Sequence, residues 1–191
     1  MELAAQRRHD GCADGPWGKA TALEQPSRRT GVAMGVPPVI AAKGSVVMQD
    51  IAQIIASDHR KVEELFDQLE SSQGDRRHLV AQVISELSAH AAAEEQLLYP
   101  AVRDMVPGGG RIADEATAEH KAMKQQLAKL EQGQPGDLEF ENALTALIDA
   151  VRTHVPKEEN ELLPALRIVI GQDKMEELGK IFEEIKGTVP T

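Results

Sequence analysis

The sequence predicts an all-α protein, an antiparallel up-down-up-down four-helix bundle followed by a short C-terminal helix. Apolar residues recur with a helical period from Met48 almost to the end of the chain, and no segment has a convincing strand pattern. The connections between the long helical segments are short, which favours antiparallel neighbours. Only 3% of the 191 residues are aromatic, so we expect a core of aliphatic side chains.

The first two helices are expected on either side of a loop at residues 71–74, where a glycine ends the first helical pattern. The first helix starts where the helical period begins, and its apolar stripe includes His59. The second helix is expected over about residues 75–104, and its apolar stripe includes His90 and Glu94.

The third helix is expected after a proline- and glycine-rich break at residues 107–110. It runs over about residues 111–132 and carries His120 on its apolar side. A second polar turn, rich in glycine, follows at residues 133–137.

The fourth helix is expected over about residues 138–170 and carries His154 and Glu158. Pro156 lies between these two residues and should kink or split the helix, because proline lacks a backbone N–H. A short amphipathic helix over residues 174–186 closes the chain.

The chain divides into two unequal parts. Residues 1–47 mix glycine, proline, arginine and polar residues without a period, so we expect a mostly disordered extension that carries none of the chemistry. An alternative is that translation starts at Met48, where the helical pattern begins. The folded domain is expected over residues 48–187, and the only cysteine, Cys12, lies outside it, which excludes a disulfide framework and a thiolate metal site.

The charge distribution restricts the partners. Residues 48–191 carry fifteen Lys and Arg against twenty-seven Asp and Glu, a net charge of −12. An acidic domain repels the phosphates of nucleic acid and of anionic membranes, whereas it attracts metal cations. The chain has no apolar run long enough for a membrane span and no signal-peptide pattern, so a cytoplasmic location is expected.

The most informative feature is a repeat of metal-ligand residues. A lone histidine followed by His-x-x-x-Glu occurs twice, and the two copies are offset by 61 to 64 residues. We call residues 58–103 the first repeat and residues 119–167 the second repeat. Two helix pairs of similar sequence would pack about a pseudo-twofold axis. The candidate metal ligands are His59, His90, Glu94, His120, His154 and Glu158.

Helix geometry places each His-x-x-x-Glu pair on one face, because residues four apart differ by about 40° around the axis. The neighbouring Glu95 and Glu159 should face solvent or an adjacent helix. Four histidines and two bridging carboxylates supply about eight of the roughly twelve bonds that two octahedral ions need, so about four positions stay open. Imidazole and carboxylate without thiolate favour iron, with manganese or zinc as alternatives.

Each of these features also has a simpler interpretation. One His-x-x-x-Glu alone is often a surface ion pair, but two copies with matched histidines on apolar stripes indicate ligands. His78 should be a surface residue. Tyr99 packs a helix end or supplies a redox phenol. Lys124 is an exposed lysine or a group that acts on bound peroxide.

The pattern resembles the hemerythrin-like family, in the branch defined by His, His-x-x-x-Glu, His, His-x-x-x-Glu and termed HHE cation-binding domains. The resemblance covers about residues 50–185 and extends to the Leu-Tyr-Pro and Leu-Leu-Pro sequences after the two glutamates. It implies a four-helix bundle with a non-haem di-iron centre, oxo or hydroxo bridged, that reacts with oxygen.

Two departures from oxygen-carrying hemerythrins bear on function. Those proteins have a further histidine where this chain has Lys124, and an aspartate five residues after the last histidine, where this chain has Glu158 at a spacing of four. One nitrogen ligand fewer favours redox chemistry or sensing over reversible oxygen transport. The resemblance therefore implies a protein that binds, senses or reacts with oxygen, peroxide or nitric oxide.

Two other functions stay open. One is a catalase-like or ferroxidase-like enzyme in oxidative-stress or iron handling, and the other is an iron-buffering or structural metal-bound bundle. Because no DNA-binding, kinase or methyl-accepting module accompanies the bundle in this sequence, a sensor would act through a separate protein partner.

Overall fold

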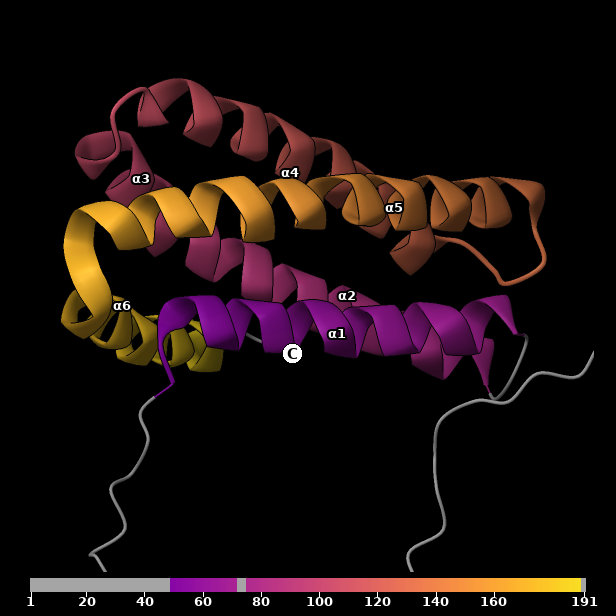
Figure 1. The fold of residues 1–191 in the computed structure, drawn as a ribbon. Coiled ribbons are helices and arrows are strands. Elements are labelled where there is room, and N and C mark those ends of the chain that lie inside the picture. Colours follow the sequence, from indigo (N-terminus) through magenta and orange to yellow (C-terminus); the bar gives the residue numbers. More distant parts are fainter. Residues whose placement is uncertain (1–48, 72–74, 190–191) are drawn as a thin grey trace, which may run out of the picture. The chain divides into compact units, whose positions relative to one another are not determined.

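The computed structural model describes residues 49–71 and 75–189, and the extension predicted over residues 1–47 lies outside this part. The described residues form helices joined by short turns, without a strand, as the sequence predicts (Figure 1). In chain order the elements are α1 (Ile51–Glu70), α2 (Arg76–Ala93), η1 (Glu94–Leu98), α3 (Tyr99–Met105), α4 (Gly109–Gln132), α5 (Leu138–Lys157), η2 (Glu158–Leu162) and α6 (Leu163–Thr188).

Two π-helical turns, η1 and η2, interrupt the helices at equivalent places in the two repeats. The predicted second helix is thus α2, η1 and α3 in succession, and the predicted fourth helix is α5, η2 and the start of α6. The chain stays helical through Pro156. The position of Pro156 in the first repeat is Ala92, and a π-helical turn follows there as well, so proline is not its cause. Each turn begins at a motif glutamate, Glu94 or Glu158.

The ends of the helices follow the sequence closely. Asp50 caps α1 in a capping box, because its side chain accepts from the Gln53 N–H and the Gln53 side chain accepts from the Asp50 N–H. Asp75 caps α2 by accepting from two backbone N–H groups of its first turn. Gly108 adopts a φ of 74° just before α4, a conformation that favours glycine.

The last helix, α6, folds back over the first repeat. Its backbone changes direction at Gly171, where φ is 77° and ψ is 173°, and the predicted C-terminal helix is the part beyond this residue. This part lies against α1 and α2 (Figure 1). The contact is close at Gly179, where a Cβ atom would lie 2.7 Å from the Gln49 carbonyl oxygen.

The core consists of two apolar clusters with a polar layer between them. One cluster, centred on Phe66, Leu69, Leu147 and Phe140, fills the end of the bundle where α1 ends and α2 begins. The other is centred on Ile51, Ile55, Leu98 and Phe182 and includes α6. On α1, α2, α4 and α5, the candidate histidines lie in sequence between residues of one cluster and residues of the other. None of the described helices is both long and apolar enough to cross a membrane.

Candidate metal centre

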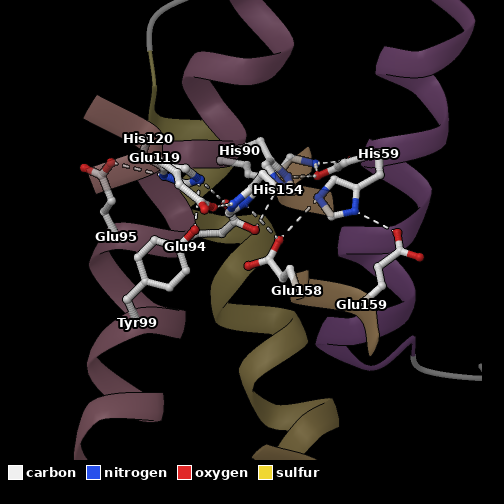
Figure 2. A network of polar contacts seen from close by, with 12 residues as sticks. His59, His90, Glu94, Glu95, Tyr99, Glu119, His120, His154, Glu158 and Glu159 are labelled. Atoms are coloured by element: carbon white, nitrogen blue, oxygen red, sulfur yellow. Dashed lines mark hydrogen bonds and ion pairs between the residues drawn. The ribbon is translucent and has the colours of Figure 1, made fainter. Parts of the chain in front are cut away.

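The structure brings all six predicted ligands together in the polar layer of the bundle (Figure 2). None of them is more than 7% exposed, although histidine and glutamate are usually surface residues. His78, in contrast, is exposed, as predicted. The six residues are His59 on α1, His90 on α2, Glu94 on η1, His120 on α4, His154 on α5 and Glu158 on η2.

Glu94 lies between histidines of the two repeats. Its Oε1 is 3.0 Å from Nε2 of His90, and its Oε2 is 3.3 Å from Nε2 of His120. One carboxylate therefore faces two imidazoles with different oxygens, which is the arrangement expected of a group that joins two cation positions.

Glu158, the motif glutamate of the second repeat, faces the other two histidines. Its Oε2 lies 3.4 Å from Nε2 of His59 and 3.6 Å from Nε2 of His154. The repeats thus exchange contacts in both directions, because each motif glutamate faces the histidine of its own helix pair and one from the other repeat.

An outer ring of carboxylates orients the four imidazoles. Each histidine directs Nε2 inward and pairs its Nδ1 with a carboxylate, which fixes the ring orientation and turns the inner nitrogen toward the candidate cation positions. The four pairs are His59 with Glu159 (2.8 Å), His90 with Asp58 (3.1 Å), His120 with Glu95 (3.2 Å) and His154 with Glu119 (2.8 Å).

These outer carboxylates were not identified as histidine partners from the sequence, although a signal exists. Asp58 and Glu119 directly precede the lone histidines, and Glu95 and Glu159 directly follow the motif glutamates. The sequence analysis expected Glu95 and Glu159 to face solvent or a neighbouring helix, and they face histidines of neighbouring helices.

Lysines neutralise three of the four outer carboxylates. Lys186 of α6 donates to Asp58, Lys124 donates to Glu95, and Lys157 pairs with Glu119. Lys124 is half-exposed and its Nζ lies 2.7 Å from both oxygens of Glu95, so it holds an outer carboxylate at the rim of the centre. Its amine therefore acts on the centre through Glu95 and His120.

Tyr99 is part of the centre. Its hydroxyl lies 2.9 Å from Nε2 of His120, and its ring is buried. In a regular α-helix Tyr99 would point about 180° away from His90. A π-helical turn takes up one extra residue, which leaves Tyr99 about 80° from His90 and directs it to the centre. The sequence left two roles open for Tyr99, packing at a helix end and a redox phenol; the ring is packed in the core, and its hydroxyl lies at the centre.

The buried charges shift the pKa values of the centre. Burial alone lowers the pKa of His90, but the charge of Glu94 and the hydrogen bond to Asp58 outweigh it and raise the pKa to about 10. Burial likewise lowers the pKa of His154, but the polar contact with Glu158 and the charge of that carboxylate outweigh burial and raise the pKa to about 9. Burial raises the pKa of Tyr99, and the charge of Glu94 adds to the effect. Protons and cations therefore compete for the same imidazole nitrogens.

The donor set fits a metal ion on an independent criterion. Buried polar atoms in proteins are almost always hydrogen-bonded, yet in the described part of the chain a group of inward-facing atoms has only the histidine–carboxylate contacts given above, none with the geometry of a hydrogen bond. These are Nε2 of His59, His90 and His154, and both carboxylate oxygens of Glu94 and Glu158. They fall into two candidate ligand groups that share Glu94: His59, His90, Glu94 and Glu158 form one, and Glu94, His120 and His154 form the other.

A small apolar cavity adjoins the histidines. Its volume is about 20 Å³, enough for roughly one water-sized molecule. Besides the four histidines and Lys124, its lining is mainly aliphatic, with Leu87, Met123, Leu127 and Val151 among the walls. The pocket among the histidine side chains therefore has room for a molecule of about the size of water or a diatomic, and no room for an organic substrate.

The comparison with known families fits this donor set. Residues 50–166 match the family described as hemerythrin HHE cation binding domain. The chain belongs to this family. Its fold is that of a hemerythrin-like bundle, and the HHE domain of this chain is a metal-cation binding domain with His and Glu clusters at its centre.

Three individual proteins are similar to the HHE domain. A DNA nickase of Nostoc sp. is 32% identical over 157 residues, which are 78% of this chain but only 44% of that protein. An uncharacterised hemerythrin-like protein of Schizosaccharomyces pombe is 26% identical over 150 residues, 77% of this chain and 74% of that protein. A crystal structure of an HHE domain-containing protein of Mycobacterium kansasii shares the fold, with a TM-score of 0.62, 24% identity and coverage of 74% of this chain and 90% of that one.

Proposed function

We propose that the HHE domain holds two iron ions and that it binds, senses or reacts with oxygen, peroxide or nitric oxide. The ligands would be His59, His90 and Glu158 for one ion and His120 and His154 for the other, with the carboxylate of Glu94 shared. The observation that carries this proposal is the set of buried, inward-facing nitrogen and oxygen atoms without hydrogen-bond partners. Such a set is costly in a protein interior unless a cation satisfies it.

The chemistry of the donors supports iron. Four imidazoles and two carboxylates, without a thiolate, suit iron better than calcium or magnesium, which prefer all-oxygen sites. Iron bound there would supply redox chemistry at the coordination positions that the protein leaves open. Manganese and zinc remain competitors, and metal analysis distinguishes them.

The residues around the centre support a small ligand. The aliphatic cavity beside the histidines is small enough to admit only small molecules. The Tyr99 hydroxyl lies within hydrogen-bond distance of Nε2 of His120 and can hold a proton at that point. Lys124 keeps the outer carboxylate of Glu95 in place, which in turn orients His120.

Turnover is the second candidate function. A catalase-like or ferroxidase-like enzyme would use the same centre, and the buried phenol of Tyr99 is the observation that favours it, because a hydroxyl beside a metal ligand can move protons. An iron-buffering or structural bundle would bind metal without responding to an oxidant. DNA cleavage is not proposed for this chain, because residues 48–191 have a net charge of −12 and the chain covers less than half of the nickase.

The deciding experiment is the metal content of protein made in iron-replete cells, read together with its near-ultraviolet and visible spectrum before and after peroxide. We expect about two irons per chain and absorption bands that change with oxidant. Sustained peroxide consumption that is abolished in Glu94→Ala would identify an enzyme, whereas stoichiometric reaction would identify a binder or sensor. Zinc with a featureless spectrum would contradict the redox function.

A further inference from the structure

A second cavity leads to the centre from the carboxylate side. Its volume is about 60 Å³, and it lies between α4 and the junction of α5 with η2. Glu158 and His154 form its inner wall, and Glu115, Glu161 and Lys157 are among the exposed residues that line it. The cavity therefore connects solvent-exposed charges with two buried residues of the centre.

We propose that this cavity is the path by which a divalent metal cation reaches the centre, with Glu161 as the outer carboxylate and Glu158 as the inner one. The inference rests on the proposed metal centre and adds the direction from which it is loaded. Glu158 is 1% exposed, and neither of its oxygens has a hydrogen-bond partner. A desolvated carboxylate of this kind, at the end of a cavity, attracts a cation strongly.

The charges along the cavity leave Glu161 available. Arg111 pairs with Glu115 at 2.6 Å on the outer surface, and Lys157 pairs with Glu119. Glu161, in contrast, forms no ion pair within the described residues. The two positive side chains are thus occupied by carboxylates, and Glu161 can meet an incoming cation in the first step.

The corresponding place in the first repeat has no such cavity lining. With the same offsets, Glu115 and Glu161 correspond to Ile54 and Leu97, and Lys157 corresponds to Ala93. Ile54 and Ala93 are buried in the apolar cluster that includes α6, and Leu97 packs against it. The two glutamates thus replace aliphatic residues at equivalent positions, and on their side two further carboxylates line the approach to the centre.

The covering helix strengthens this contrast. Phe182 of α6 is fully buried, and its ring centroid lies 5.9 Å from that of His90. Lys186 of the same helix, 17% exposed, pairs with Asp58. Loading from the first repeat would therefore require α6 to move away, whereas loading past Glu161 requires only that side chains move.

The test is the rate at which the full chain, stripped of metal by chelation, takes up Co²⁺ at low ionic strength. Cobalt bound by histidine and carboxylate absorbs visible light, so stopped-flow absorbance gives both rate and final occupancy. We expect Glu161→Gln to slow uptake about three- to tenfold, because one carboxylate at the mouth attracts a divalent ion by roughly that factor in a watery environment. Glu161→Lys should slow it further, with final occupancy unchanged.

Controls separate charge from geometry. Glu139→Gln removes an equal charge from the far end of α5, about 22 Å along the helix from His154, and should load like the wild type. The defect of Glu161→Gln should shrink in high salt. Ala116 lies in the cavity wall, and the equivalent residue of α1 is Ile55. Ala116→Ile narrows the cavity without changing its charge, so it should slow uptake at every salt concentration.

The outcomes distinguish this path from the centre itself. Uptake by Glu161→Lys at the wild-type rate, with full occupancy, would overturn the path and leave the proposed metal centre standing. Failure of the wild type to bind cobalt at all would overturn both. Slow uptake by Glu161→Gln and Glu161→Lys, beside normal uptake by Glu139→Gln, would support the path.

Discussion

The two repeats build the same inner ligands but differ in what surrounds them. In the first repeat, the flank of the centre is aliphatic and α6 lies over it, with Phe182 fully buried. In the second repeat, the equivalent flank is charged and borders a cavity. The inner ligands of the two repeats are thus symmetric, because two cation positions need equivalent donors. The flanks are not symmetric, because α6 covers the first repeat and a cavity borders the second.

The symmetry extends one layer beyond the ligands. Asp58 of α1 orients His90, and its counterpart Glu119 of α4 orients His154. Glu95 orients His120 of the second repeat, as Glu159 orients His59 of the first. The lysines break the pattern, because Glu159 has no lysine within ion-pair distance in the described part of the chain. The four outer carboxylates thus follow the symmetry of the repeats, whereas the lysines follow it only at Asp58 and Glu119.

The largest expected effect is on metal content, and it compares the two motif glutamates. Glu94 belongs to both ligand groups, whereas Glu158 belongs to one. Glu94→Gln should therefore lose most of both metal equivalents, with an affinity at least about 100-fold weaker, because even residues behind the ligands commonly cost 10- to 100-fold. Glu158→Gln should keep about one equivalent. Elemental analysis after dialysis measures both, with the exposed Glu64→Gln as control, and equal losses would show that the two carboxylates bridge equivalently.

The next effect concerns the stability of the covered side. Phe182→Ala removes a fully buried aromatic side chain from the contact of α6 with His90, and we expect a loss of about 3–5 kcal/mol in the free energy of unfolding. Ile168→Ala, in the first part of α6, removes a side chain that is 85% exposed and should cost little. Urea unfolding of the two variants makes the comparison. Similar midpoints would mean that α6 does not hold the first repeat closed.

A smaller effect follows from Asp50, which caps α1, and from its counterpart Arg111 in the first turn of α4. Asp50 is buried and accepts from Arg167 at 3.0 Å and from Gln172, whereas its counterpart Arg111 only pairs with Glu115 on the surface of α4. Asp50→Asn keeps the helix cap but loses the charge, so we expect a loss of about 1–2 kcal/mol. Arg111→Gln should change stability by less than about 0.5 kcal/mol.

The contribution of Asp50 should also depend on pH. Burial acts to raise its pKa, but the hydrogen bonds from Arg167, the Gln53 backbone and Gln172 outweigh it and hold the pKa below the ordinary value of 3.8. A lowered folded-state pKa stabilises the protein above the unfolded pKa, and this stability is lost as pH falls through the folded value. The difference between the wild type and Asp50→Asn should therefore be constant from about pH 5 to 7 and shrink below about pH 4. A difference that grows in acid would contradict this assignment.

The sequence was sufficient for the bundle and the six candidate ligands for a physical reason. Both depend on helical periodicity, and residues three and four apart share a face whatever the neighbouring helices do. Glycines in the sequence likewise indicate the turn before Gly109 and the change of direction at Gly171. The symmetry of the two repeats then made the convergence of His90 and His154 predictable without knowledge of the packing.

Periodicity fails where the helical repeat itself changes. The π-helical turns η1 and η2 contain one extra residue per turn, so every angle counted beyond Glu94 or Glu158 is displaced, and the direction of the Tyr99 side chain does not follow from the α-helical period. The partners of Glu95 and Glu119 depend on which helices are neighbours, and a one-dimensional pattern does not contain that information. The cover of α6 over one repeat is a tertiary property of the same kind.

The smallest expected effect concerns the one ring that breaks the symmetry inside the centre. Tyr99 is the only tyrosine of the chain, and its counterpart in the second repeat is Leu163, a buried apolar residue. Tyr99→Phe removes a hydroxyl that lies beside Nε2 of His120, and we expect at most about 1 kcal/mol of lost stability, full metal content and a small shift in the visible spectrum of the cobalt-loaded protein. Loss of one metal equivalent would instead show that the phenol oxygen is itself a ligand. In that case the asymmetry between the repeats would extend from the approach to the centre into the coordination of the ions, because only the cation beside His120 would depend on a tyrosine.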